Sequence, residues 1–237
     1  MRTVTILLLI SSAFCVSARK LEARALKHTP SLDNSCLSEE VLRSTISQLS
    51  GGTTEAVHAQ ESLVRDARMG VNCRIQVIKG LGDVMSKNST IDRDAASYYF
   101  WRYGASILAE LKAVEALDLL TSHLTLNDGT SSFGIPHRPA ASAVIEIGSP
   151  AIPKLYSLIQ ESSDRKTRLY AVYCLGLIGG PSARAALTRA NRRETDTCVK
   201  AFIQMTLHAF NNARAPNKVT SRDRTEWLLA FSCDGAA

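Results

Sequence analysis

Side chains that could perform catalysis are scattered along this chain and are not grouped by a recognisable spacing. None of the five histidines is followed by glutamate, and none stands at metal-ligand spacing from a cysteine. The chain contains no His-Glu-x-x-His, no Gly-x-Ser-x-Gly and no phosphate-binding loop. The sequence therefore predicts no catalytic residue, no metal and no cofactor.

Two carboxylates, Glu110 and Glu146, occupy matching places in a weak internal repeat. If they faced each other, they would form a general acid/base pair. A structural role at the ends of two helices is the interpretation that we favour.

An aromatic cluster at residues 98–103 is a candidate binding platform. Five of its six residues are aromatic. A helical core stripe through this segment would leave Tyr99 or Trp101 nearer the surface, beside Arg102. Rigid rings in such a place gain contact area at low entropic cost. Ordinary packing of these rings is the alternative, since aromatic residues at helical spacing are usually packed in the core.

A second binding candidate is the basic helix expected after Pro181. Residues 181–237 carry nine basic and five acidic side chains, which makes this end the basic part of a chain with pI about 9.1. An arginine-lined face would suit carboxylates or phosphates, on a protein, a lipid head group or a nucleic acid. A simply solvated helix face is the alternative. The arginines outside the apolar stripe of this helix are Arg184, Arg189, Arg192 and Arg193.

Helical periodicity runs through most of the chain, and strand alternation is nowhere sustained. Ser38 is a good N-cap for the first helix, which ends at Gly51-Gly52. The fold class is therefore all-α. Further helices are expected at 53–69, 72–86, 92–111, 117–124, 165–178, after Pro181, at 197–210 and at 221–232.

A repeat of one turn motif sets the expected architecture. Ile147-Gly148-x-Pro150 recurs as Ile178-Gly179-x-Pro181, 31 residues later, which is the length of one helical hairpin. Glycine ends the first helix of such a hairpin, and proline suits the first turn of the next. The spacing predicts an α-solenoid of stacked antiparallel helical hairpins over residues 38–237. Its repeats are clearest at 139–190, and residues 196–232 form a C-terminal cap.

With these motifs the chain resembles the HEAT-like repeats of the type named after phycobilisome lyases. Their units look like an Ala-rich helix, a Gly-x-Pro or Gly-Asp turn and a second helix. The resemblance is clear for residues 139–190 and degenerate for 38–124. It implies that the second helices line a concave face. Such motifs are structural and carry no activity by themselves.

The N-terminal residues are typical of a secretory signal. Arg2 precedes an apolar stretch at residues 4–16, and small residues follow as Val16-Ser17-Ala18. We predict a signal peptide at residues 1–18, cleavage after Ala18 and a secreted or periplasmic protein; a short membrane anchor is the alternative. Residues 19–37 are interpreted as a flexible leader.

Five cysteines follow the predicted signal, an odd number for an exported chain in which thiols tend to pair. If the helices alternate in direction, the helix after Cys36 and the helix containing Cys73 run parallel, so that these two cysteines emerge at one end and can pair. Cys198 begins one helix, and Cys233 closes the antiparallel final helix, which predicts a second bridge. Cys174 lies on an apolar stripe and is expected to be a buried thiol.

These features predict a secreted, non-catalytic scaffold that binds a protein or peptide partner on its concave helical face. Two alternatives stay open. One is a lyase- or hydrolase-type enzyme with a site in the arginine-lined concavity; the other is a basic module for anionic polymers. Export argues against genomic DNA as a partner, and no segment after the signal is apolar for long enough to cross a membrane.

Overall fold

The computed structural model describes residues 35–88, 95–127 and 137–212. The predicted signal peptide and residues 19–34 of the predicted leader lie outside these ranges. The expected final helix at 221–232 and Cys233 also lie outside them. Predictions about those segments stay predictions.

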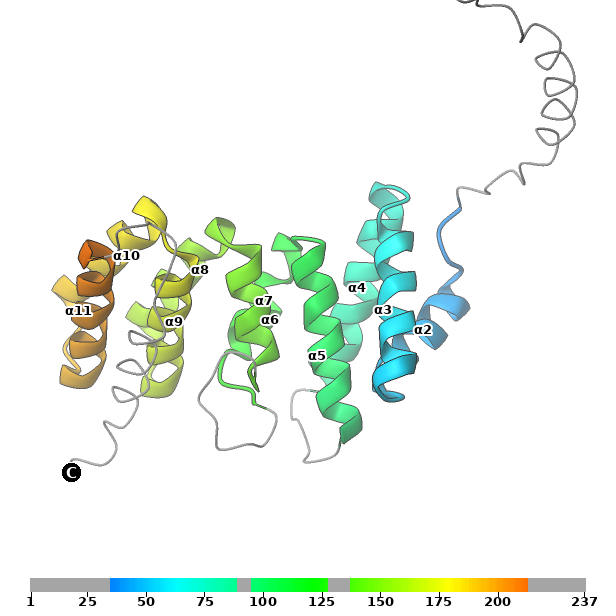
Figure 1. Ribbon diagram of the computed structural model, residues 1–237, viewed down its shortest axis with the longest axis horizontal. Helices are drawn as coiled ribbons and strands as arrows, with labels where there is room; N and C mark the ends of the chain where they lie inside the picture. The colour runs from blue at the N-terminus through cyan, green and yellow to red at the C-terminus, as the bar shows by residue number, and fades with distance from the viewer. Residues whose placement is uncertain (1–34, 89–94, 128–136, 213–237) are drawn as a thin grey trace, which may run out of the picture. The chain divides into compact units, whose positions relative to one another are not determined.

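All regular secondary structure in the described ranges is helical, with no strand, so the fold class is all-α (Figure 1). Helix ends differ from the predicted ones by up to two residues where both are described, except that the first helix, expected to end at Gly51-Gly52, ends at Ser47 and is followed by a 3-10 turn that reaches Ser50. The helices are α2 (Glu39–Ser47), α3 (Thr53–Ala67), α4 (Val71–Lys87), α5 (Ala95–Glu110), α6 (Leu117–Ser122), α7 (Pro139–Ile147), α8 (Ile152–Glu161), α9 (Arg165–Ile178), α10 (Gly180–Arg193) and α11 (Thr197–Asn212), with short 3-10 turns η1 (Gln48–Ser50), η2 (Val114–Ala116) and η4 (Ser149–Ala151).

Capping side chains explain where two of the helices begin. The hydroxyl of Ser38 accepts a hydrogen bond from the N–H of Val41 (3.4 Å) and so caps α2. The carboxylate of Asp164 caps α9 by accepting from the N–H groups of Lys166 (3.2 Å) and Thr167 (2.9 Å). Both helices begin where the sequence predicts.

The two repeated turns have the same backbone construction. Gly148 ends α7 with φ +85°, and Gly179 ends α9 with φ +71°. Each glycine N–H donates to the carbonyl four residues earlier, at 3.1 and 3.0 Å. Pro150 and Pro181 then stand in the first turn of the following helical segment. Positive φ is the conformation for which glycine is suited, and the preset φ of proline suits a helix start.

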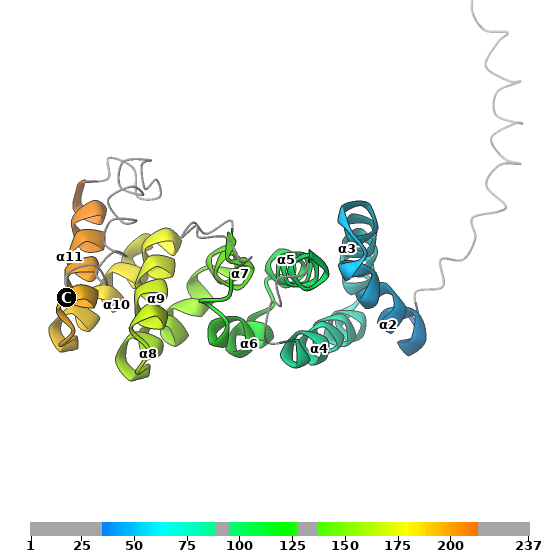
Figure 2. The ribbon, with the colours of Figure 1, turned by 90° about the horizontal axis from the view of Figure 1, so that it is seen from below.

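The helices pack mostly against helices that are close to them in sequence. α3, α5, α7, α9 and α11 lie side by side, each in contact with the next (Figures 1 and 2). The intervening helices α4, α6, α8 and α10 lie in a second row, where α6 contacts α8 and α8 contacts α10. Buried apolar side chains from α2 to α11 form one continuous cluster.

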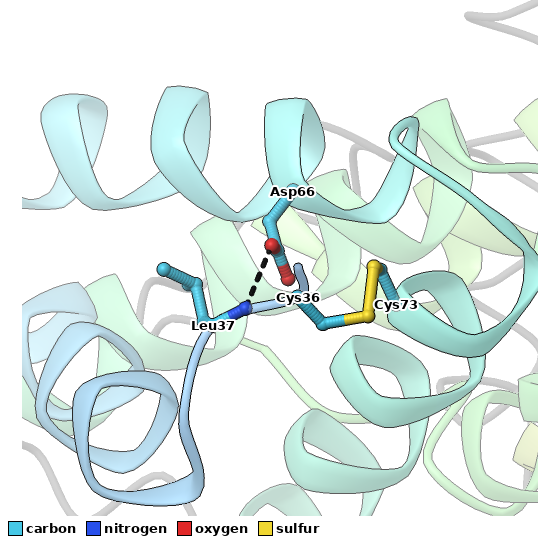
Figure 3. Close-up of a disulfide and its surroundings, with 4 residues drawn as sticks. All are labelled: Cys36, Leu37, Asp66 and Cys73. Atoms are coloured by element: carbon cyan, nitrogen blue, oxygen red, sulfur yellow. Dashed lines mark hydrogen bonds between the residues drawn. A yellow bond between two sulfur atoms is a disulfide. The ribbon is translucent and has the colours of Figure 1, made fainter. Parts of the chain in front are cut away.

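A disulfide joins Cys36 to Cys73, as the sequence predicts (Figure 3). It ties the residues before α2 to the beginning of α4. The neighbouring N–H of Leu37 donates to Asp66 Oδ1 of α3 (3.0 Å). The last two residues of the predicted leader are thus anchored to two helices.

The other described cysteines differ in state. Cys174 is a free thiol, fully buried in α9. Cys198, in the first turn of α11, is disulfide-bonded. Its expected partner, Cys233, lies outside the described residues, so that pairing stays a prediction.

Candidate functional site

The aromatic cluster on α5 is arranged differently from the expectation for Trp101. This side chain is fully buried, its indole N–H donates to the carbonyl of Asn88 (2.6 Å), and its ring lies 4.8 Å from the His123 ring. The expectation that Trp101 lies near the surface is therefore wrong. α5 contacts α3, α4 and α7, so it buries more than the single stripe that helical spacing suggested.

The rest of the cluster keeps an accessible edge. Tyr99 is half-buried, and its ring stacks on that of Tyr103 with 6.2 Å between centroids. Arg102 is exposed, and its Nη1 donates to the Tyr98 hydroxyl oxygen (3.2 Å). Tyr99 and Arg102 are thus accessible at the surface, whereas Trp101 is not.

A small polar groove of about 260 Å³ runs between α5 and α7. Its middle is made of short side chains, which lets a ligand approach the helices closely. Arg102 and Glu146 are the charged residues that line it. The full lining is Tyr98, Arg102, Ser106, Ala109, Pro139, Ser142, Ala143 and Glu146.

The two carboxylates considered as an acid/base pair are each bound to a cation of another element. Glu110 pairs with Arg68, the residue that follows α3 (2.8 Å). Glu146 lies 4.0 Å from the ammonium of Lys112, which also donates to the Glu146 carbonyl. Both contacts link neighbouring helices near their ends, which supports the structural interpretation.

The arginines predicted on α10 are brought to one exposed surface. Arg184, Arg189 and Arg192 line a shallow depression of about 410 Å³, whose other walls are Pro181, Ala185 and Thr188. Arg193, the last residue of the helix, is exposed but does not line it. Arginine rows of this kind bind carboxylates and phosphates.

A third groove, of about 420 Å³, lies between α4 and the segment formed by η2 and α6. It combines an apolar centre with a charged rim. Sequence periodicity did not single it out, because its two walls are forty residues apart in the chain. Its lining is Ile75, Ile78, Lys79, Gly82, Asp83, Ser86, Glu115, Ala116, Asp118 and Leu119.

Exposed apolar residues adjoin this α4–α6 groove. Val71 is 73% exposed and Ile75 55% exposed, one helical turn apart on α4, and Val114 of η2 is 47% exposed. η2 contacts α4, so these residues are carried by neighbouring elements. We call the three residues the apolar strip. The sequence signal for the strip is that α4 carries two apolar residues, Val71 and Ile75, in addition to those that are buried. The buried ones are Cys73, Val77, Ile78, Leu81 and Met85.

Ion pairs hold the rim of the α4–α6 groove in place. Arg74 of α4 donates to the carbonyl of Leu111 (2.5 Å) and lies 3.3 Å from Glu115. Asp118 of α6 pairs with Lys154 of α8 (2.6 Å). The groove is therefore built on elements linked by polar contacts as well as by packing.

A cluster of four charged residues joins α9 to α11 and is a structural feature. Arg168, largely buried, lies 3.3 Å from both Glu194 and Asp196, and Asp196 also pairs with Arg165 (2.7 Å). The Glu194 carboxylate accepts hydrogen bonds from the N–H groups of Thr195 (3.0 Å) and Asp196 (2.9 Å). These charges neutralise one another within the fold, so the cluster offers no unpaired reactive group.

Among the described residues, no three His, Cys, Asp or Glu side chains are grouped so as to hold a metal ion. In the same residues no helix has the length and apolar character needed to span a membrane. Comparisons of the chain with protein-family models, curated proteins and solved structures find no match.

Proposed function

We propose that this chain is an exported, non-catalytic scaffold for a protein or peptide partner, and that the α4–α6 groove binds an apolar side chain of that partner. The observation that carries the proposal is the apolar strip of Val71, Ile75 and Val114 beside the groove. The occupant that fits is a polypeptide segment with a bulky aliphatic or aromatic anchor residue.

Hydrophobic burial supplies the driving force. Fully burying a side chain of the size of isoleucine stabilises by about 1.5–3 kcal/mol. Ile75, at 55% exposed, leaves part of that gain for a partner. The groove volume lies in the range of about 300–1,000 Å³ that is usual for ligand sites. An anchor residue seated there would contact Ile78, Ala116 and Leu119.

The charged residues at the rim of the α4–α6 groove would orient the bound polypeptide segment. Lys79 and Asp83 lie one helical turn apart on α4, and both are exposed at the groove. An apolar centre surrounded by polar groups is the usual arrangement of a protein interface. The rim would pair with the partner's polar groups while the apolar centre provides most of the affinity.

We also propose that the helical hairpins form an α-solenoid of the HEAT-like kind. The matching turns at Gly148 and Gly179 and the packing of each helix on its near neighbours support this arrangement. In such a solenoid α4, α6, α8 and α10 would be second helices and would line the concave face, so the α4–α6 groove would lie on that face. The disulfide between Cys36 and Cys73 is typical of an exported protein.

A displayed peptide library selected on the purified chain tests the groove. The variants are Ile75→Asp and a matched control, Val41→Asp, because Val41 is 47% exposed on α2 and does not line the groove. Selected peptides should carry an aliphatic or aromatic anchor. They should lose at least tenfold in affinity, about 1.4 kcal/mol, for Ile75→Asp and keep their affinity for Val41→Asp.

Thermal unfolding of both variants checks that each is folded. Two outcomes would refute the groove as the binding site. One is equal binding of the selected peptides to Ile75→Asp and to the unchanged chain; the other is a selection that yields no specific peptide.

A further inference from the structure

α10 carries an uncompensated positive charge. Its fourteen residues include four arginines and no aspartate or glutamate. Among the described residues, no carboxylate forms an ion pair with Arg184, Arg189, Arg192 or Arg193. Elsewhere in the same residues, Arg68, Arg74 and Arg165 each pair with a carboxylate. α10 therefore presents guanidinium groups that are available to an anionic ligand.

Two of these guanidinium groups are held in place by neighbouring helices. Arg184 donates to the side-chain oxygen of Asn211 on α11. Arg189 lies over the ring of Tyr156 on α8, with 4.9 Å between the guanidinium carbon and the ring centroid. Each contact leaves other N–H donors of the guanidinium free to bind a ligand. Such fixing reduces the entropy that binding would otherwise cost.

The spacing of the arginines suits an extended polypeptide. Arg184, Thr188 and Arg192 follow one another at four-residue intervals, about 6 Å along the helix axis. Side chains on one face of an extended strand recur at about 6.6–6.8 Å. Arg184 and Arg192 are therefore about 12 Å apart along the axis, close to two such strand repeats, so acidic residues four positions apart on one strand face would meet these two guanidinium groups, and the residue between them would meet Thr188. The planar guanidinium binds a carboxylate through two parallel hydrogen bonds.

The surroundings favour a polypeptide over a single-stranded nucleic acid. Proteins that bind single strands combine positive charge with aromatic rings on which bases stack. α10 has no aromatic residue, and the ring beside it, Tyr156, already stacks with Arg189. The short side chains of Ala185 and Thr188 leave a shallow depression in which a narrow chain can lie.

We infer that the arginine face of α10 binds an extended acidic polypeptide segment that carries Asp or Glu residues along one strand face. The inference rests on the proposed function, because it assigns a second contact to the same class of partner. It involves residues that the α4–α6 groove does not share, so the two sites can be tested separately.

The test uses a fluorescein-labelled peptide of five Glu-Ser repeats, whose binding to the full chain is followed by fluorescence anisotropy. Replacing Arg184, Arg189 and Arg192 by Gln should weaken binding at least tenfold. A matched control replaces Arg65, Lys87 and Lys166, all exposed and on other helices, by Gln and so removes the same charge. The control should bind within about twofold of the unchanged chain.

Three further measurements complete the test. Replacing the same arginines by Lys should weaken binding several-fold, because lysine keeps the charge and loses the two-pronged geometry. Affinity should fall as salt rises. Ile75→Asp should bind the acidic peptide normally, whereas the triple Arg→Gln variant should still bind groove-selected peptides. A failure of one site is thereby distinguished from a failure of the other.

The inference is overturned by any of three results. The first is equal weakening in the matched control, which would show unspecific attraction by net charge. The second is tighter, arginine-dependent binding of a labelled ten-residue oligo-dT, which would identify α10 as a nucleic-acid site. The third is absence of binding to the Glu-Ser peptide at low salt.

Discussion

Cys174 lies in the core of α9, and its burial raises the pKa of its thiol well above the usual range. An apolar environment disfavours the thiolate, which is the form that reacts with alkylating reagents. Cys36, Cys73 and Cys198 are disulfide-bonded. Cys174 is therefore the one free thiol among the described residues, and whether it is alkylated depends on whether the reagent can reach its Sγ.

We predict that a maleimide at pH 8 leaves the native, unreduced chain unmodified at Cys174. In denaturant without reductant it should modify Cys174 alone in the mature chain, which lacks the predicted signal and its Cys15, provided that Cys198 pairs with Cys233 as predicted. Peptide mapping by mass spectrometry gives the modified positions. Labelling of Cys198 or Cys233 in that experiment would contradict the second bridge, and labelling of all five would exclude both.

Two carboxylates that cap helices, Asp164 at α9 and Asp196 at α11, make the stability of the fold fall in acid. The hydroxyl of Thr167 donates to Asp164 (2.6 Å) and is the main cause of the lowered pKa of that carboxyl. For Asp196, burial alone would raise the pKa, but the hydrogen bond from Arg165 and those from the N–H groups of Val199 and Cys198 outweigh it. Both carboxyls therefore bind protons more weakly in the folded chain than in the unfolded one.

The sign of the pH effect follows from these shifts. The stabilisation is fully present above the unfolded-state pKa of about 3.9 and is lost as pH falls through the lower folded-state value. Asp196→Asn keeps a side-chain oxygen that can cap α11 but removes the charge that pairs with Arg165 and Arg168, so it should lower stability at pH 7 by up to about 1 kcal/mol and should make the decline in acid shallower. Melting temperatures measured by circular dichroism between pH 7 and pH 2 check this.

Asp83→Asn is the matched control, because Asp83 is exposed on α4 and caps no helix. Its melting temperatures should follow those of the unchanged chain at every pH. If Asp196→Asn followed them as well, the ion pairs of Asp196 with Arg165 and Arg168 would not contribute to stability.

The turn that ends α7 depends on the backbone freedom of one glycine. Gly148 has φ +85°, and a Cβ added there would meet no atom closer than 3.9 Å. Gly148→Ala would therefore suffer backbone strain and no steric clash. We expect a loss of about 1–3 kcal/mol in the free energy of unfolding, measured by urea denaturation.

Gly82 provides the contrast for this prediction. It lies within α4, and an added Cβ would meet nothing within 4 Å. Gly82→Ala should leave stability unchanged or raise it by up to about 1 kcal/mol, because alanine favours the helical conformation. Equal effects of the two substitutions would refute the role of positive φ at Gly148.

Features confined to one helix could be predicted from the sequence. The bounds of α9 follow from its Asp164 cap and the terminating Gly179. The arginines of α10 share a surface because helical periodicity alone places Ala183, Ala186, Leu187 and Ala190 on the buried side.

Two features that depend on contacts between helices could not be predicted, although the Cys36–Cys73 bridge could. The α4–α6 groove exists because α4 packs beside η2, a contact that no local pattern encodes. Trp101 is buried because α5 has neighbours on several sides, and helical spacing alone cannot tell which stripe each neighbour covers.

Contacts between near neighbours imply that stability is distributed unevenly over the described chain. α2 packs mainly on α3 and α4, and the Cys36–Cys73 bridge adds a covalent restraint at that end. With 37 residues separating the two cysteines, the loop-closure account gives a stabilisation of about 4 kcal/mol. Helical repeats often open locally from their ends.

Hydrogen exchange followed by mass spectrometry tests this on the Cys36→Ser, Cys73→Ser double variant. Amides of α2 should exchange faster than in the unchanged chain, whereas those of α9 to α11 should change little. A uniform loss of protection from α2 to α11 would show a single cooperative unit and would count against the proposed solenoid.

The bridge has a further consequence for proteolysis. Cys36 and Cys73 enclose α2, α3 and the Gly51-Gly52 turn between them in one covalent ring. A protease that cuts the peptide chain in that turn opens the ring without releasing either fragment. The nicked protein would migrate as one species until a reductant separates it into two, so a cut at this place would not release α2.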